Sequence, residues 1–271
     1  MSRILYVQPI FAPDKKRLER NIDSLKSMSR YIKTNNLSVP VIFGGWCKNE
    51  EYLDEIKKIC HKGNFPNLVG VMKFERNYGK AVVVNKLVNR CIEESVEFDY
   101  ILTADSDIVF KDDTINLFGR LDEVIKQTEC KGKFGMISLQ QEGNCCHLPM
   151  VYKNNLKYKS CFGVEEEVVW PNGKGGIAGG CIFVSRKAWE EVGGYRVMGV
   201  YAGDDAYLLI DLMDKGYTVQ MFKTLSVIHP HDDDEEYAKW KVKVCQRDSS
   251  GGKIKSNIDS LIEESEKFWE K

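Results

Sequence analysis

The sequence predicts an α/β fold in which one mostly parallel sheet carries helices on both faces, within a single domain. Short apolar runs that are typical of buried strands alternate with segments whose apolar residues recur every three or four positions. Such alternation favours a parallel sheet with right-handed crossovers. The chain of 271 residues is long enough to bury a core of this size.

The first 110 residues show the alternation most clearly. Strands are expected at 3–8, 39–43, 68–74 and 100–103, and helices at 15–35, 52–60 and 81–91. The helix at 15–35 follows from the spacing of Leu18, Ile22 and Leu25, and the pair Gly44-Gly45 ends the second strand. Ligands bind beyond the carboxyl ends of strands in such sheets, so the residues after each strand are the first candidates for a site.

The second half is less regular. Strands are expected at 134–139, 177–184, 218–222 and 226–229, and helices at 187–192, 204–215 and 254–269. No unit of 20–50 residues repeats, so a solenoid is not expected.

Composition excludes several classes of protein. The net charge is −1 and 43% of the residues are hydrophobic, which argues against disorder and against a surface built wholly for nucleic acid. No run of 18 apolar residues is present, so we expect no transmembrane anchor, and the N-terminus does not resemble a signal peptide. Nine cysteines without a C-x-x-C pair predict mostly buried thiols in a cytoplasmic protein, and the adjacent Cys145, Cys146 and His147 lack zinc-ligand spacing.

Asp105-Ser106-Asp107 follows the expected strand at 100–103 after one residue, Ala104. Two carboxylates at the ligand end of a parallel sheet either bind a hard divalent cation or repel each other. A strand-ending turn with solvated aspartates would give the same letters, and a second D-x-D at 232–234 lies in an acidic run. The prediction therefore depends on where the first pair lies relative to the strand, and not on the D-x-D pattern alone.

Gly203-Asp204-Asp205 opens an apolar helix. An aspartate is a favoured N-cap, which accounts for one of the two acids. A second acid at this point could act as a general base toward a substrate hydroxyl.

Two further groups of residues follow strands. His229-Pro230-His231 ends the last expected strand, and imidazole often joins carboxylates around manganese-like ions, although a lone histidine is more often structural. Asn77-Tyr78-Gly79-Lys80 runs into a helix, where backbone N–H groups and a lysine suit a phosphate. The latter pattern is weak on its own, and neither a Walker motif nor G-x-G-x-x-G is present.

These motifs, taken in order, resemble those of glycosyltransferases with the GT-A fold. They read R-N-Y-G-K, D-Y-I-L-T-A-D-S-D, G-G-C-I-F-V-S-R-K-A-W-E-E-V-G-G-Y, G-D-D-A-Y-L-L and I-H-P-H. The most similar pattern is that of the large inverting "family 2" group and related galactosyltransferases, and it covers about residues 3–232. The long G-G…G-G-Y stretch is the most specific part.

The resemblance implies a role for each matching residue. Asp205 matches the base that deprotonates the acceptor hydroxyl, and Asp204 replaces a glutamate that often orients the acceptor. The implied metal is Mn²⁺ or Mg²⁺, with ligands drawn from Asp105, Asp107 and His229 or its rival His231. The implied donor-binding residues are Pro9, Arg76, Asn77, Lys80, Asp105, Ser106 and Gly180.

The resemblance also implies a domain plan and an activity. Residues 1–235 would form the GT-A domain, with a nucleotide-sugar half at 1–110 and an acceptor half at 111–235, followed by a basic helical extension at 236–271. The expected activity is metal-dependent, inverting transfer of a sugar from a nucleotide-sugar donor to a glycan, a lipid-linked saccharide or another hydroxyl. A UDP-sugar is the expected donor. Trp46 stands where many members carry an acid that contacts uracil, and its ring could stack on the base instead. No Q-x-x-R-W motif is present, so a processive polymer synthase is not expected.

Other readings remain open from the sequence. A sugar-phosphate nucleotidyltransferase would need a glycine-rich loop near the N-terminus, which residues 9–16 lack, and an inactive carbohydrate- or nucleotide-binding module would not need the acids and histidines. The basic stretch from Lys239 to Lys255 is either a solvated face or a contact for an anionic acceptor, such as a membrane surface or a hydroxylated base in viral DNA.

Overall fold

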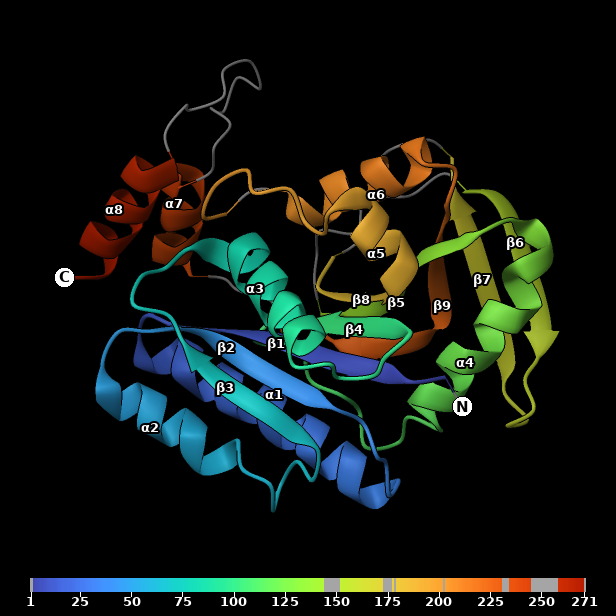
Figure 1. The fold of residues 1–271 in the computed structure, drawn as a ribbon, viewed down its shortest axis with the longest axis horizontal. Helices are drawn as coiled ribbons and strands as arrows, with labels where there is room; N and C mark the ends of the chain where they lie inside the picture. Colours follow the sequence, from blue (N-terminus) through green and yellow to red (C-terminus); the bar gives the residue numbers. More distant parts are fainter. Residues whose placement is uncertain are drawn as a thin grey trace.

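The computed structural model describes residues 2–143, 152–172, 177, 179–201, 203–230, 234–244 and 258–270. Within these residues, nine strands form one continuous sheet in the order β3-β2-β1-β4-β8-β5-β9-β7-β6 (Figure 1). The predicted α/β class and the single sheet across both halves are therefore confirmed.

The first half has the predicted alternation of strands and helices. β1 (Ile4–Ala12), β2 (Val41–Cys47), β3 (Leu68–Lys73) and β4 (Tyr100–Ala104) pair in parallel. The connecting helices are α1 (Lys15–Thr34), α2 (Glu50–Ile59) and α3 (Gly79–Glu93). Asp14 and Asn49 cap α1 and α2 by accepting hydrogen bonds from backbone N–H groups of the first turn, which fixes where these helices begin.

The second half contains more elements than the sequence predicted. The strands are β5 (Phe134–Glu142), β6 (Tyr152–Lys159), β7 (Glu165–Pro171), β8 (Cys181–Ser185) and β9 (Thr218–Ile228). The helices are α4 (Leu117–Thr128), a 3₁₀ turn (Glu129–Lys131), α5 (Arg186–Val192), α6 (Asp204–Asp214), α7 (Glu235–Val244) and α8 (Ile258–Trp269). β6, β7 and α4 were not predicted. The two strands expected at 218–222 and 226–229 are one strand, β9, whose register against β5 shifts after Leu139.

The sheet is mixed beyond β4, where a mostly parallel one was expected. β8 runs antiparallel to both β4 and β5, whereas β5 and β9 are parallel to each other. The start of β8 therefore lies at the same sheet edge as the carboxyl ends of β4, β5 and β9. This edge is where the site residues of both halves can meet.

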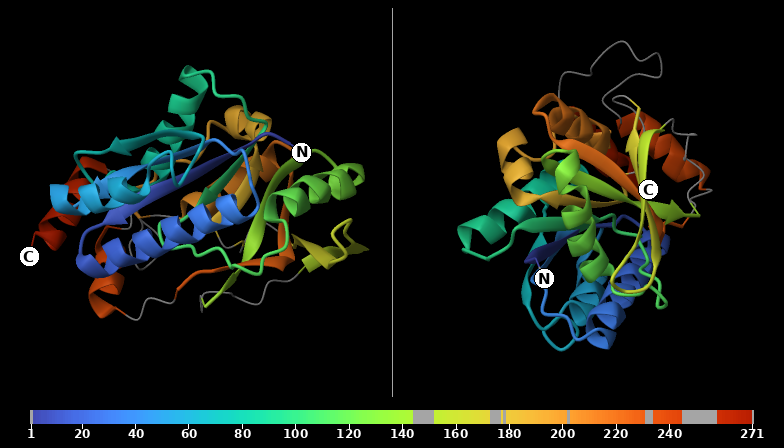
Figure 2. Two further views of the ribbon diagram at one scale, coloured as in Figure 1. Left: turned by 90° about the horizontal axis from the view of Figure 1, so that it is seen from below. Right: turned by 90° about the vertical axis from the view of Figure 1, so that its right-hand side faces the viewer.

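Helices cover both faces of the sheet, as predicted (Figures 1 and 2). Successive side chains of β1 point to opposite faces of the sheet. Tyr6 packs in a core with α1, α2 and α4, whereas Leu5 and Val7 pack in a second core with α3, α5 and α6. All three of these side chains are fully buried. The sheet thus rests between two apolar layers and forms a rigid base for the residues at its edge.

α7 and α8 lie side by side beyond α3 (Figure 1) and form a third apolar cluster with the end of β1. Phe11 of β1 stacks on Trp240 of α7 at 5.0 Å between ring centroids, and on Trp46 of β2 at 6.1 Å. The C-terminal helices are therefore packed against the carboxyl ends of the first strands.

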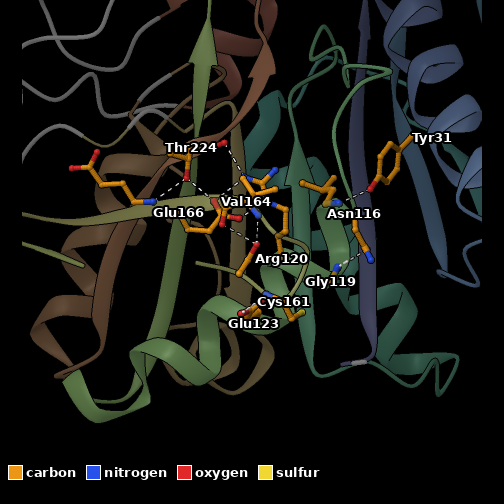
Figure 3. Close-up of polar contacts among 12 residues, drawn as sticks. Tyr31, Asn116, Gly119, Arg120, Glu123, Cys161, Val164, Glu166 and Thr224 are labelled. Carbon is orange, nitrogen blue, oxygen red and sulfur yellow. Dashed lines mark hydrogen bonds and ion pairs between the residues drawn. The ribbon is translucent and has the colours of Figure 1, made fainter. Parts of the chain in front are cut away.

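A buried ion pair ties α4 to the second half of the sheet (Figure 3). Arg120 donates two hydrogen bonds to Glu166 of β7, at 2.5 and 2.8 Å, and a third to the carbonyl oxygen of Thr224. The hydroxyl of Thr224 donates to Glu166 at 2.6 Å. Every oxygen of the buried carboxylate is thus bonded, as burial of a charge requires.

Two further expectations concern cysteines and membranes. In the described part of the chain six cysteines have free thiols, and Cys60, Cys91 and Cys181 are the buried ones. Cys145, Cys146 and His147 lie outside the described residues. None of the helices described is both long and apolar enough to cross a membrane.

Candidate active site

Lys80 and Asp105 form the centre of the candidate site. Asp105 follows β4, and its backbone N–H donates to the carbonyl oxygen of Gly180 at 2.7 Å, which holds the two strand ends together. The ammonium of Lys80, in the first turn of α3, lies 2.7 Å from Oδ1 of Asp105 and donates to the carbonyl oxygen of Gly179 at 3.0 Å. Lys80 also lies over the ring of Tyr195, 5.6 Å from its centroid.

Burial and charge act in opposite directions on this pair. Burial raises the pKa of Asp105 above its usual range, although the Lys80 ammonium favours the carboxylate. Burial alone would lower the pKa of Lys80, but the carboxylates of Asp105, Asp204 and Asp205 outweigh it and raise the pKa. Lys80 therefore stays charged as the cation among these acids.

Asp107 and His229 form a second pair of side chains at the site. Nε2 of His229 lies 3.4 Å from Oδ1 of Asp107, and Nδ1 lies 2.8 Å from Oε1 of Gln141. Burial would raise the pKa of Asp107, but the hydrogen bond and charge of the protonated His229 ring prevail and lower it. Burial would lower the pKa of His229, and the Asp107 carboxylate raises it instead. Arg20 of α1 adds a second cation 4.0 Å from Asp107.

These residues fit a divalent cation that is shared with a substrate. Among the residues described, no group of three or more His, Cys, Asp or Glu side chains could hold a metal by itself. Asp107 and His229 supply two converging ligand atoms, and a cation such as Mg²⁺ is commonly bound by one or two carboxylates together with substrate phosphates. Asp105 pairs with Lys80 here, so its place among the metal ligands remains a prediction.

Asp204 and Asp205 lie in the first turn of α6, and neither is its N-cap. The N-cap is Gly203, so the interpretation of an aspartate cap is wrong, and both acids instead lie near the positive end of the helix dipole. Oδ2 of Asp204 is buried and has no hydrogen-bond partner among the described residues. Burial, together with the charges of Asp205 and Asp105, raises the pKa of Asp204 to about 6. A buried carboxylate oxygen without a hydrogen-bond partner among the described residues is typical of a functional site rather than of a structural cap.

Asp205 points toward Gly179 at the entrance to β8. A Cβ atom added to Gly179 would overlap the Asp205 carboxylate, so the glycine provides the space that this side chain fills. Oδ1 of Asp205 accepts a hydrogen bond from the N–H of Ala206 at 3.0 Å. The two acids therefore occupy different surroundings, as expected for neighbours separated by about 100° around a helix.

Arg76 and Asn77, expected near the donor, are bonded to α8. Arg76 donates two hydrogen bonds to Glu266, at 2.8 and 2.7 Å, and Asn77 donates to Ser265 at 3.0 Å. Gly79, at φ +81, packs so closely against Val200 that a side chain would overlap the backbone there. In this structure the turn anchors the C-terminal helices, and a role of Arg76 and Asn77 in donor binding remains a prediction.

The remaining predicted residues lie along the same edge. Pro9 pairs with Gly44 between β1 and β2, and Ser106 lies between the two aspartates after β4. Trp46, expected to stack on a base, stacks on Phe11. His231 lies outside the described residues, so the choice between the two histidines rests on the observed place of His229.

Sequence reasoning missed two residues that complete the site. Gln141 is 1% exposed and lies within hydrogen-bond distance of His229, and the ring of Tyr195 lies under the ammonium of Lys80. Gln141 follows the expected strand at 134–139, so the search at strand ends could have found it. Tyr195 is the last residue of the G-G-Y motif, and the resemblance implied no role for this tyrosine.

Comparison with known proteins identifies the fold. No family model and no curated protein matches the sequence. Among solved structures, the mannosyltransferase PcManGT from Pyrobaculum calidifontis, in complex with GDP-Man and Mn²⁺, is 13% identical with a TM-score of 0.55 over 89% of this chain. GalNAc-T7 with UDP, GalNAc and Mn²⁺ is 12% identical with a TM-score of 0.55 over 100% of this chain. This chain covers 60% and 55% of those two proteins. The chain therefore has the GT-A fold of these two glycosyltransferases.

Proposed function

We propose that this chain is an inverting glycosyltransferase that moves a sugar from a nucleotide-diphosphate donor to an acceptor hydroxyl. The observation that carries the proposal is the meeting of two acidic groups at one sheet edge of a GT-A fold. Asp105 and Asp107 with His229 form one group, and Asp204 with Asp205 forms the other. Lys80 lies between them and interacts with acids of both.

The first group suits the donor. Asp107 and His229 would hold a divalent cation, Mn²⁺ or Mg²⁺, and the bound cation would offset the negative charge of the diphosphate leaving group. Asp105 would contact the donor, as the D-x-D resemblance implies. Lys80 keeps Asp105 in place and keeps the N-terminus of α3 next to the strand ends.

The second group suits the acceptor. Asp205 would accept the proton of the acceptor hydroxyl while that oxygen forms a bond to the anomeric carbon and the bond from this carbon to the diphosphate breaks. Attack from the face opposite the leaving group inverts the anomeric carbon. Asp204, whose buried oxygen Oδ2 lacks a hydrogen-bond partner among the described residues, would orient the acceptor.

The identities of the donor and the acceptor are also proposals. A UDP-sugar is the proposed donor, although Trp46 packs on Phe11 within the aromatic cluster of the C-terminal helices. An anionic acceptor at Lys239–Lys255 gains no support: the ammonium of Lys241 lies over the rings of Tyr201 and Tyr237, at 4.9 and 4.3 Å from their centroids. We therefore propose a glycan, a lipid-linked saccharide or another hydroxyl as the acceptor, and a cytoplasmic location remains a prediction.

A screen of nucleotide sugars tests the proposal. The protein is incubated with each nucleotide sugar and Mn²⁺, and mass spectrometry detects the released nucleoside diphosphate. We expect slow hydrolysis of one donor class that chelator abolishes and that Asp107→Asn reduces strongly, while the exposed Asp112→Asn changes nothing. Release of nucleoside monophosphate and sugar phosphate would instead indicate hydrolysis of the diphosphate, and formation of nucleoside triphosphate and sugar phosphate when pyrophosphate is added would indicate a sugar-phosphate nucleotidyltransferase. Binding without turnover of any donor would support an inactive module and contradict the proposal.

A further inference from the structure

We propose that Gln141 is a positioning residue that fixes the tautomer of His229, so that the Nε2 lone pair faces Asp107 at the metal position. The inference rests on the proposed function only for the role of the metal, which is to bind the diphosphate of the donor. The geometry of Gln141, His229 and Asp107 stands without it.

Gln141 is held rigidly where it meets the histidine. It lies near the end of β5, is 1% exposed, and pairs in register with Val227 of the neighbouring strand β9. This register brings its side chain to the end of β9, where Oε1 lies 2.8 Å from Nδ1 of His229. Gln141 lies in β5, and His229 directly follows the adjacent strand β9 and donates from its backbone N–H to the carbonyl oxygen of Glu142 at 2.8 Å, so the ends of two paired strands position both residues.

Gly180 supports the amide of Gln141 from the other side. A Cβ on Gly180 would lie 2.9 Å from Oε1, 3.0 Å from Nε2 and 3.1 Å from Cδ of Gln141, so the amide packs directly against the glycine. The carbonyl oxygen of Gly180 accepts from the N–H of Asp105 at 2.7 Å. One continuous set of contacts therefore joins the D-x-D segment, the start of β8, Gln141 and His229.

The acceptor at Nδ1 decides which nitrogen of His229 can bind a cation. A neutral imidazole has one N–H and one lone pair. Asp107, 3.4 Å from Nε2, would by itself favour the tautomer with the hydrogen on Nε2, and that hydrogen would block the metal position. Because Oε1 of Gln141 accepts from Nδ1–H, it favours the opposite tautomer and leaves the Nε2 lone pair toward Asp107.

The first test reads the tautomer directly in the metal-free native protein. The chain has four histidines, so ¹⁵N-labelled histidine gives few NMR signals, and His229→Asn identifies the pair to be assigned. At alkaline pH, where the ring is neutral, we expect a protonated Nδ1 and an unprotonated Nε2. Protonation on Nε2 would overturn the proposal, whatever the enzyme transfers.

The second test compares variants. Gln141→Leu should shift His229 to the Nε2–H tautomer and weaken binding of Mn²⁺ alone, measured by electron paramagnetic resonance, about 10- to 100-fold. Gln141→Glu keeps an acceptor at Nδ1 and should keep both the tautomer and the affinity. Gln140→Leu, one position earlier on β5, is the matched control and should change neither.

The outcomes separate this inference from the proposed function. Native affinity or an unchanged tautomer in Gln141→Leu overturns the positioning role. If Gln141→Leu does not fold, as judged by thermal unfolding, loss of the native tautomer in Gln141→Glu would overturn it instead. The expected tautomers and Mn²⁺ affinities, found in a protein that cleaves no nucleotide sugar, would support the role of Gln141 and contradict the proposed function.

Discussion

Asp205 of α6 packs against Gly179, which lies just before β8, although the two residues are 26 positions apart in the chain. The Asp205 side chain fills the space that a Cβ on Gly179 would need, and the carbonyl oxygen of the same glycine accepts a hydrogen bond from Lys80. The backbone segment at Gly179 thus sets the position of the proposed base and also binds the ammonium of Lys80. Glycine is required here for close approach of the backbone to a side chain.

Gly179→Ala should therefore displace the proposed base without removing it. We expect turnover to fall about 10- to 1,000-fold, because a small misplacement of a catalytic group is costly, while donor affinity changes little. Steady-state kinetics and donor titration measure the two quantities. Gly70→Ala is the control, since a Cβ there would meet no atom within 4 Å. Unchanged turnover in Gly179→Ala would mean that the position of Asp205 does not limit the reaction.

Asp205→Asn and Asp204→Asn should differ in kind. Asparagine cannot accept the proton, so Asp205→Asn should lower turnover by roughly 10²–10⁴ with donor binding retained. Asp204→Asn should act mainly through the KM for the acceptor, because Asp204 is proposed to orient it. A nearly native Asp205→Asn with an inactive Asp204→Asn would exchange the two roles. If both remain active, the inverting mechanism is wrong.

The raised pKa of Asp204 predicts how stability depends on pH. Its pKa is about 6 in the folded protein, against 3.8 ordinarily, so the folded state retains a proton between these values that the unfolded chain loses. The resulting contribution to stability is present below pH 4 and is lost as pH rises through 6. Asp204→Asn should remove this dependence. The free energy of unfolding at pH 7.5 minus that at pH 4.5 should then be about 1–2 kcal/mol larger in the variant than in the unsubstituted protein. Denaturant titrations at both pH values check it; a parallel pH profile for the two proteins would contradict it.

The sequence predicted the edge of the sheet where the site lies because its information is local. Asp105 and Asp107 directly follow a buried strand, and a parallel strand places its carboxyl end beside those of its neighbours. α4 could have been predicted from the three-and-four spacing of Leu117, Leu121 and Val124. β6 could not, since Tyr152–Lys159 is rich in lysine and asparagine and pairs within the sheet only with β7.

Contacts between distant segments were beyond sequence reasoning. Arg76 and Asn77 follow β3 as a phosphate-binding turn would, yet their partners Glu266 and Ser265 come 190 and 188 residues later. Likewise, Trp46 has the chemistry to stack on a base, but Phe11 already covers one of its faces. Residue type and position along a strand indicate what a side chain can do, whereas tertiary packing decides what it contacts.

Ser265 is predicted to hold the C-terminal helices in place. Its Oγ accepts hydrogen bonds from Nε1 of Trp240 and from Nδ2 of Asn77, both at 3.0 Å, and it is fully buried. Ser265→Ala would leave two buried donors without their acceptor, at about 1–3 kcal/mol each. We expect faster hydrogen exchange in α7 and α8 and a lower free energy of unfolding, and no such change for Lys267→Ala at an exposed position of the same helix. Native exchange rates in Ser265→Ala would show that the aromatic cluster alone holds these helices.

The Arg120–Glu166 pair should be costly to break and cheap to replace (Figure 3). Its side chains are 6% and 0% exposed, so removing one partner leaves an uncompensated buried charge. Glu166→Leu should lower the free energy of unfolding by about 3–5 kcal/mol, as should Arg120→Met. The double variant buries two apolar chains of similar size and should be more stable than either single variant.

A double-mutant cycle by denaturant unfolding measures this coupling. We expect the two single losses to exceed the loss in the double variant by at least about 2 kcal/mol, since the pair acts as a unit. Thr224→Val tests the third member, whose hydroxyl donates to Glu166, and should cost about 1 kcal/mol. Additive losses would mean that each charge is stabilised separately, by water or by other groups, and that the ion pair does not connect α4 to the sheet.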